Sequence, residues 1–130
     1  MAIKINSVLL IDDDETTNFI HERVIKKAGI TENIIKAENG KVALDYLKET
    51  NSKPDLIFVD LNMPVLNGWE FLEQYRQLDE VQKGKVVIIM LTTDVNPYAD
   101  TDKAPIHNFL NKPLTSEALN KILQEYFTSD

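Results

Sequence analysis

Short apolar runs alternate with amphipathic segments along this sequence, and the alternation limits the folds that the chain can adopt. A short, largely apolar run suits a strand buried on both faces, and the longer segments between the runs have helical period. Repeated strand–helix units build a parallel sheet between two layers of helices, through right-handed crossovers. We therefore predict a three-layer α/β sandwich. Its five strands should cover residues 7–11, 33–37, 56–59, 86–91 and 107–110.

The helical segments are recognised by apolar side chains that recur every three or four residues. In the first segment Ile20, Val24 and Ala28 have four-residue spacing, which predicts that they form the buried stripe of a helix. Gly29 then stands where helices commonly end in a left-handed residue. Thr115, a residue type that caps helix N-termini, precedes the last segment. The predicted full helices cover residues 17–28, 41–49, 69–78 and a final segment from 115 onward.

The segment between Asp94 and Pro105 departs from this pattern. It contains two prolines and three aspartates but few apolar side chains. Pro97 can open a helix, whereas Pro105 cannot continue one, because proline has no backbone amide to donate. We therefore expect a shortened fourth helix within residues 97–103. Its weak docking suits a segment whose order changes when the protein switches.

The composition restricts the protein to a few classes. A chain of 130 residues has the usual size of one domain, so we expect a single domain at residues 1–130, with a core at about 7–127 and no output domain. The net charge of −7 has the wrong sign for direct binding to nucleic acid. No cysteine is present, which excludes disulfides and suits a reducing compartment. Without a signal peptide or an apolar run long enough to span a membrane, we expect a cytoplasmic protein.

Side chains capable of chemistry follow the predicted strands at the points where they end. They are Asp12, Asp13 and Asp14 after the first strand, Asp60 after the third, Thr92 and Thr93 after the fourth, and Lys112 after the fifth. The carboxyl ends of parallel strands meet at one edge of a sheet, so these groups should converge. Crowded carboxylates need a cation, and an all-oxygen ligand set favours Mg²⁺. A carboxylate beside that ion can attack phosphorus while lysine and threonine stabilise the phosphoryl oxygens, which predicts phosphoryl transfer to an aspartate.

Four motifs at these strand ends resemble the receiver domain of two-component response regulators. They lie at residues 8–15, 55–64, 90–93 and 109–114, with the sequences VLLIDDDE, DLIFVDLNMP, MLTT and FLNKPL. The resemblance implies a flavodoxin-like fold with strand order 2-1-3-4-5. It also implies a stand-alone regulator that receives a phosphoryl group from a sensor histidine kinase or a histidine phosphotransfer protein. Such a protein is not an enzyme acting on a free substrate, and it signals to a downstream protein by a conformational change.

The resemblance also implies a phosphoacceptor and a set of metal ligands. Asp60 would accept the phosphoryl group. Asp12, Asp13 and Asp60 would hold Mg²⁺ together with the backbone carbonyl of Asn62. Asn62 and Asp94, each two residues beyond a site residue, would set how quickly water removes the phosphoryl group.

Other residues would read out the phosphorylated state. Thr92 and Lys112 would contact the phosphoryl group, and Phe109 would swing inward as the threonine moves. Phenylalanine replaces the more frequent tyrosine there, so no hydroxyl contact to a partner can form. The bond before Pro113 lies where the family usually has a cis peptide. Because the fourth helix is short, we expect no dimer through it and a monomeric protein.

Two other interpretations are open. Asp12, Asp14 and Thr16 spell D-x-D-x-T, which resembles the nucleophile motif of haloacid-dehalogenase-type phosphatases and would make Asp12 the nucleophile. That mechanism needs a later strand that ends in an acidic pair, and neither the fourth nor the fifth predicted strand does. A receiver-like binding module without phosphorylation is disfavoured, because the acids, the threonine and the lysine are all present.

The two histidines belong to none of these motifs. Neither His21 nor His107 has a recognisable partner for charge relay or metal binding in the sequence. We expect both side chains to be exposed to solvent and neither to carry the phosphoryl group.

Overall fold

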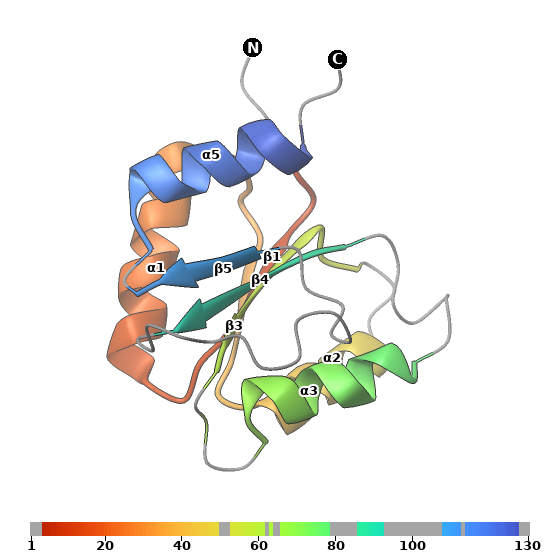
Figure 1. Ribbon diagram of the computed structural model, residues 1–130. Coiled ribbons are helices and arrows are strands. Elements are labelled where there is room, and N and C mark those ends of the chain that lie inside the picture. Colours follow the sequence, from red (N-terminus) through yellow and green to blue (C-terminus); the bar gives the residue numbers. More distant parts are fainter. Residues whose placement is uncertain are drawn as a thin grey trace.

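A five-stranded parallel sheet lies at the centre of the fold (Figure 1). The computed structural model describes residues 4–49, 53–61, 63, 66–78, 86–92, 108–112 and 114–127. In this part of the chain the strand order is β2-β1-β3-β4-β5, which confirms the prediction. The strands are β1 (Val8–Ile11), β2 (Ile34–Ala37), β3 (Leu56–Asp60), β4 (Val87–Thr92) and β5 (Asn108–Asn111).

The helices of the described residues pack in pairs against the two faces of the sheet. α1 (Glu15–Ala28) and α5 (Ser116–Tyr126) lie on one face, and α2 (Gly40–Glu49) and α3 (Gly68–Arg76) lie on the other (Figure 1). This arrangement is the predicted three-layer sandwich. The predicted short helix at residues 97–103 lies outside the described residues. None of the helices described combines the length and the apolar character that crossing a membrane requires.

Alternation along the strands divides the core into two clusters, one under each helix pair. Successive side chains of a strand point to opposite faces, so Leu9 and Ile57 pack toward α2 and α3, whereas Leu10 and Phe58 pack toward α1 and α5. Every residue of β1 and β3 is buried, as expected for strands covered on both sides. Each apolar side chain among them contributes about 1.5–3 kcal/mol by its burial. Packing against both clusters therefore fixes the positions of the carboxyl ends of these strands.

Local capping residues set the ends of the helices. Asp14 is the N-cap of α1 and accepts a hydrogen bond from the backbone N–H of Thr16 at 3.3 Å, so the helix begins two residues earlier than predicted. Gly29 ends α1 in the left-handed conformation at φ 69°, as predicted. Thr115 caps α5, also as predicted. The sequence therefore encodes these boundaries locally.

The buried face of α1 differs from the predicted one. Two of the three residues in the predicted apolar stripe are exposed, because Ile20 is 45% exposed and Ala28 also faces solvent. The buried residues of the helix are instead Asn18, His21 and Ile25. The expectation that His21 is exposed is therefore wrong, while His107 lies outside the described residues. On this face the side chains of Asn18 and His21 form hydrogen bonds to backbone groups outside the helix.

Candidate functional site

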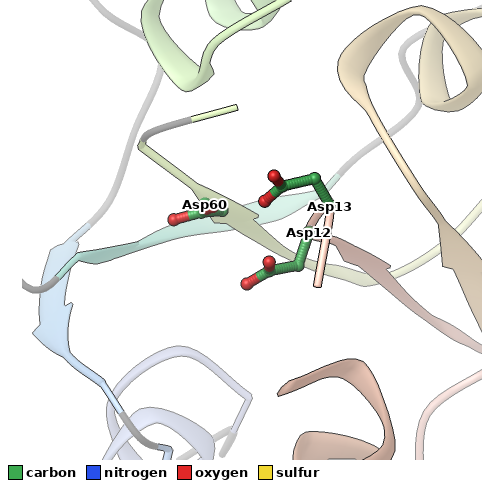
Figure 2. A group of neighbouring side chains, drawn as sticks. All are labelled: Asp12, Asp13 and Asp60. Carbon is green, nitrogen blue, oxygen red and sulfur yellow. The ribbon is translucent and has the colours of Figure 1, made fainter. Parts of the chain in front are cut away.

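Three carboxylates meet where β1 and β3 end. Figure 2 shows Asp12, Asp13 and Asp60 gathered at this edge of the sheet, and one oxygen of each lies within 4.8 Å of the others. Asp12 is 3% exposed and Asp60 is 5% exposed, whereas Asp13 faces solvent. Carboxylates this close repel one another strongly when they are out of water. The cluster therefore requires positive charge nearby.

Strand pairing explains why these carboxylates converge. Ile11 of β1 pairs in parallel with Val59 of β3, so the residue that follows each of them in the chain is one of the two buried aspartates. The backbone N–H of Asp12 donates to the Ala37 carbonyl at 3.1 Å, which ties this position to β2 as well. The acidic site is consequently a product of the sheet register and needs no special loop.

Gly68, the first residue of α3, packs directly against the backbone of Asp60. A Cβ atom at position 68 would lie 2.6 Å from the Asp60 carbonyl oxygen and 3.0 Å from the Cα of Leu61. The Gly68 N–H donates to the Leu61 carbonyl at 2.9 Å, and this hydrogen bond keeps the start of α3 close to the end of β3. A glycine is required here because no side chain fits between the helix and the end of β3.

Lys112 supplies positive charge to the cluster from the end of β5. Its Nζ lies 2.7 Å from Oδ2 of Asp12 and 2.9 Å from Oδ1 of Asp60. Burial by itself lowers the pKa of this lysine, but the hydrogen bonds and the attraction of Asp12 and Asp60 outweigh it and raise the pKa above its usual value. The ammonium therefore stays protonated at neutral pH. Three carboxylates and this ammonium together carry two net negative charges.

This donor set fits a hard divalent cation. All three side chains offer carboxylate oxygens, which are ligands that Mg²⁺ prefers, and the exposed Asp13 leaves the cluster open to solvent on one side. A divalent ion would balance the remaining negative charge. The predicted metal ligands Asp12, Asp13 and Asp60 are thus brought together, while Asn62 lies outside the described residues.

The remaining predicted site residues fall into two groups. Thr92 is the last residue of β4 and pairs with Asn111, so it reaches the same edge of the sheet as Asp60, which pairs with Leu91. Phe109 lies on β5 opposite Met90 of β4. The other predicted positions, Asn62, Thr93, Asp94 and Pro113, lie outside the described residues.

Sequence reasoning missed two residues that support the site from α1. The Asn18 Nδ2 donates to the backbone carbonyl of Asp12 at 3.0 Å. The His21 Nε2 accepts a hydrogen bond from the backbone N–H of Leu114 at 3.2 Å. A signal was present, because Asn18, His21 and Ile25 share one helical face. It was concealed because two of the three side chains are polar.

Asp14, the second acid of the D-x-D-x-T motif, is not part of the cluster. Its carboxylate accepts hydrogen bonds from the Thr16 N–H and the Thr17 hydroxyl, where it caps α1. The Thr17 hydroxyl is the main cause that lowers the pKa of Asp14. The motif is therefore accounted for by helix capping, which leaves little support for a phosphatase that uses Asp12.

Comparison with known proteins points to one family. The sequence matches the family profile of the response regulator receiver domain over residues 8–124. The two-component response regulator ORR41 of Oryza sativa subsp. japonica is 32% identical over 129 residues, which cover 97% of this chain and 98% of that protein. Two-component response regulator 24 of Arabidopsis thaliana is 30% identical over 92% of this chain and 82% of its own length.

Solved structures agree with the sequence matches. A two-component response regulator from Cytophaga hutchinsonii superposes with a TM-score of 0.83 at 34% identity, over 94% of this chain and 96% of that one. A response regulator receiver protein from Dyadobacter fermentans gives a TM-score of 0.83 at 28% identity, over 95% of this chain and 99% of that one. The flavodoxin-like fold implied by the motifs is confirmed.

Proposed function

The chain belongs to the response regulator receiver family, and from this premise we propose that Asp60 accepts a phosphoryl group and that the protein signals by a change of its surface. One observation carries the proposal: Asp60 is buried at the end of β3, is ion-paired with Lys112 and lies beside the carboxylates of Asp12 and Asp13. A nucleophilic carboxylate, a fixed ammonium and spare acidic ligands are what phosphoryl transfer requires.

Asp12, Asp13 and Asp60, with the backbone carbonyl of Asn62, would hold Mg²⁺. When bound, the ion neutralises the acidic cluster and accepts a phosphoryl oxygen. The two net negative charges left after Lys112 is counted support this assignment. Asp13 is the exposed member of the set, so its carboxylate is free to adjust to an incoming ligand.

In the transfer step, an oxygen of Asp60 forms a bond to phosphorus while the bond from phosphorus to the donor's imidazole nitrogen breaks. The donor ring is protonated on its other nitrogen, so it leaves as a neutral imidazole, and the product is an acyl phosphate on Asp60. Lys112 is already 2.9 Å from Oδ1 of Asp60, so its ammonium stands beside the site where charge collects. The Thr92 hydroxyl is the second group proposed to contact the phosphoryl oxygens.

The proposed conformational change involves Thr92 on β4 and Phe109 on β5. Thr92 and Phe109 lie on these adjacent strands, so movement of the threonine toward phosphate would let the phenylalanine ring turn inward. The segment from 94 to 105, which begins two residues after the end of β4, is the proposed site of the surface change. Asn62 and Asp94 would set the lifetime of the acyl phosphate, and the bond before Pro113 is a candidate cis peptide.

The proposed phosphodonor is a sensor histidine kinase or a histidine phosphotransfer protein, and the signal passes to a downstream protein. We propose a monomer in the cytoplasm that does not bind nucleic acid or membranes directly. The net charge of −7 supports the absence of nucleic-acid binding, and the lack of cysteine suits a reducing compartment.

Labelling with acetyl phosphate tests the proposal. We expect Mg²⁺-dependent labelling that Asp60→Asn abolishes, while Lys112→Ala still allows labelling but uncouples it from the surface change. Asp12→Asn should weaken labelling by removing a metal ligand. A label that Asp60→Asn leaves intact and Asp12→Asn removes would favour the phosphatase. Complete absence of label in the wild type would favour the binding module.

A further inference from the structure

Two polar side chains are buried on the inner face of α1 although apolar ones on the same helix are exposed. Asn18 is 5% exposed and His21 is 1% exposed. Phe19 and Ile20, which are 53% and 45% exposed, lie on the outside. Burying polar groups costs free energy unless they form hydrogen bonds. The buried face of α1 is therefore set by the hydrogen bonds of these two residues together with the burial of Ile25, which is 0% exposed.

Asn18 holds the segment that carries Asp12. Its Nδ2 donates to the Asp12 backbone carbonyl at 3.0 Å, just beyond the end of β1. The Oδ1 of Asn18 has no hydrogen-bond partner within the described residues, so the side chain is not fully satisfied even in this position. The Asn18 side chain therefore bonds to Asp12 although this position leaves its buried Oδ1 without a hydrogen bond in the described part of the chain, which points to a role at the site.

His21 holds the segment that carries Lys112. Its Nε2 accepts a hydrogen bond from the backbone N–H of Leu114 at 3.2 Å, two residues beyond the lysine. Burial lowers the pKa of His21, and the repulsion of Lys112 adds to this effect while the attraction of Asp12 opposes it. The ring is therefore neutral at pH 7, with the Nε2 lone pair available to accept.

We propose that Asn18 and His21 are positioning residues, which tie the Asp12 and Lys112 segments to one rigid helix and thereby fix the ion pair that faces Asp60. The inference rests on the proposed phosphoryl transfer to Asp60. Lys112 Nζ bridges Asp12 and Asp60 at 2.7 and 2.9 Å, so a small shift of its backbone removes one of the two contacts. Displacements of about 1 Å near a reacting group can change rates by as much as roughly 100-fold.

The test compares His21→Gln with His21→Leu. The glutamine Oε1 is as many bonds from Cα as the histidine Nε2, so it can accept the same hydrogen bond, whereas leucine fills the space without an acceptor. Initial rates of labelling by acetyl phosphate in Mg²⁺ are measured over a range of donor concentrations. We expect His21→Leu to lower the maximal rate roughly tenfold and His21→Gln to keep it within about threefold.

A second readout separates positioning from stability. The Leu114 amide proton should move upfield in the NMR spectrum of His21→Leu and stay in place in His21→Gln, because only leucine removes the acceptor. Ile20→Ala, an exposed substitution on the same helix, serves as the control and should keep the wild-type rate. If His21→Leu does not fold, His21→Asn replaces it, because the asparagine oxygen is one bond too short.

The results separate the two proposals. A wild-type protein that takes no label at Asp60 sinks the proposed function itself. A labelled wild type with an unchanged maximal rate in His21→Leu overturns the positioning role alone. The positioning role is likewise overturned if His21→Gln loses the rate as strongly as the variant without an acceptor, although its Leu114 amide proton is unchanged.

Discussion

The two helical layers reach the acidic cluster in different ways. On one side, α3 approaches the end of β3 backbone to backbone, and Gly68 leaves no space between the helix and Asp60. On the other side, α1 reaches the site through side-chain hydrogen bonds from Asn18 and His21. Close backbone packing, as at Gly68, cannot tolerate a larger side chain. A side-chain hydrogen bond can be kept when the residue is replaced by another one that offers an acceptor at the same place. The two layers should therefore respond differently to mutation.

The largest expected effect is on the α3 side. Gly68→Ala places a methyl group 2.6 Å from a backbone oxygen, so α3 or the end of β3 must move. We expect the free energy of unfolding to fall by about 3 kcal/mol, as in overpacked cores, together with slower labelling. Gly29→Ala is the matched control. Nothing lies within 4 Å of its Cβ, and only the left-handed backbone is strained, at about 1 kcal/mol. Urea unfolding measures the loss of stability in both variants. Equal losses in the free energy of unfolding would show that close packing at Gly68 costs no more to disturb than backbone strain at Gly29.

The cluster between the layers should respond to metal. Mg²⁺ binds only the native arrangement of carboxylates, so at ten times its dissociation constant the free energy of unfolding should rise by about 1.4 kcal/mol. Asp13→Asn should lose most of this gain at little cost to the apo protein, because Asp13 is exposed. Glu15→Gln, an exposed acid beside the same hollow, is the control and should keep the gain. An unchanged melting temperature on addition of Mg²⁺ would count against a metal site.

A smaller effect is expected on the α1 side as the pH falls. Burial lowers the pKa of His21 below its usual value of 6.5, so the unfolded chain binds the proton more tightly than the folded protein. The contribution of neutral His21 to the free energy of unfolding is fully present above about pH 6.5 and is lost progressively as the pH drops below this value. His21→Gln should remove this contribution. Urea unfolding between pH 7.5 and 5.5 checks it, and the same loss of stability in both proteins would contradict it.

The smallest effect is expected for the ion pairs that Glu22 of α1 makes with two lysines. Glu22 forms ion pairs with Lys36 at 3.0 Å and Lys26 at 3.4 Å, and both lysines are largely exposed. Water and salt screen such pairs, so Glu22→Gln should cost no more than about 0.5 kcal/mol. Thermal unfolding at low and high salt tests this. A loss as large as that of Gly68→Ala would contradict the small contribution expected from these ion pairs.

Most of the fold could be predicted because its determinants are local. Apolar runs located the strands to within one residue, and Gly29 and Thr115 marked helix ends through their own conformational preferences. The contact between Lys112 and Asp12 spans 100 positions, yet it followed from topology, since parallel strands end at one edge. The convergence of Asp12, Asp13, Asp60 and Lys112 was predictable for the same reason.

The orientation of α1 could not be predicted in this way. Its four-residue apolar spacing predicted that Ile20 is buried. The helix instead buries His21, whose hydrogen-bond partner is a backbone group 93 positions away. No local pattern shows that a polar side chain will find an acceptor or a donor across the fold. The expectation that His21 faces solvent was therefore wrong, and the burial of Asn18 was not predicted at all; only the packed structure shows both.

The most direct test of phosphoryl transfer to Asp60 is to locate the phosphoryl group. The protein is incubated with acetyl phosphate and Mg²⁺, and the modified peptide is identified by mass spectrometry, with Asp60→Asn and a metal-free sample as controls. We expect one phosphoryl group on Asp60, present only with Mg²⁺ and absent from the variant. A phosphoryl group on Asp12 or on any other residue, or equal labelling of Asp60→Asn, would contradict it.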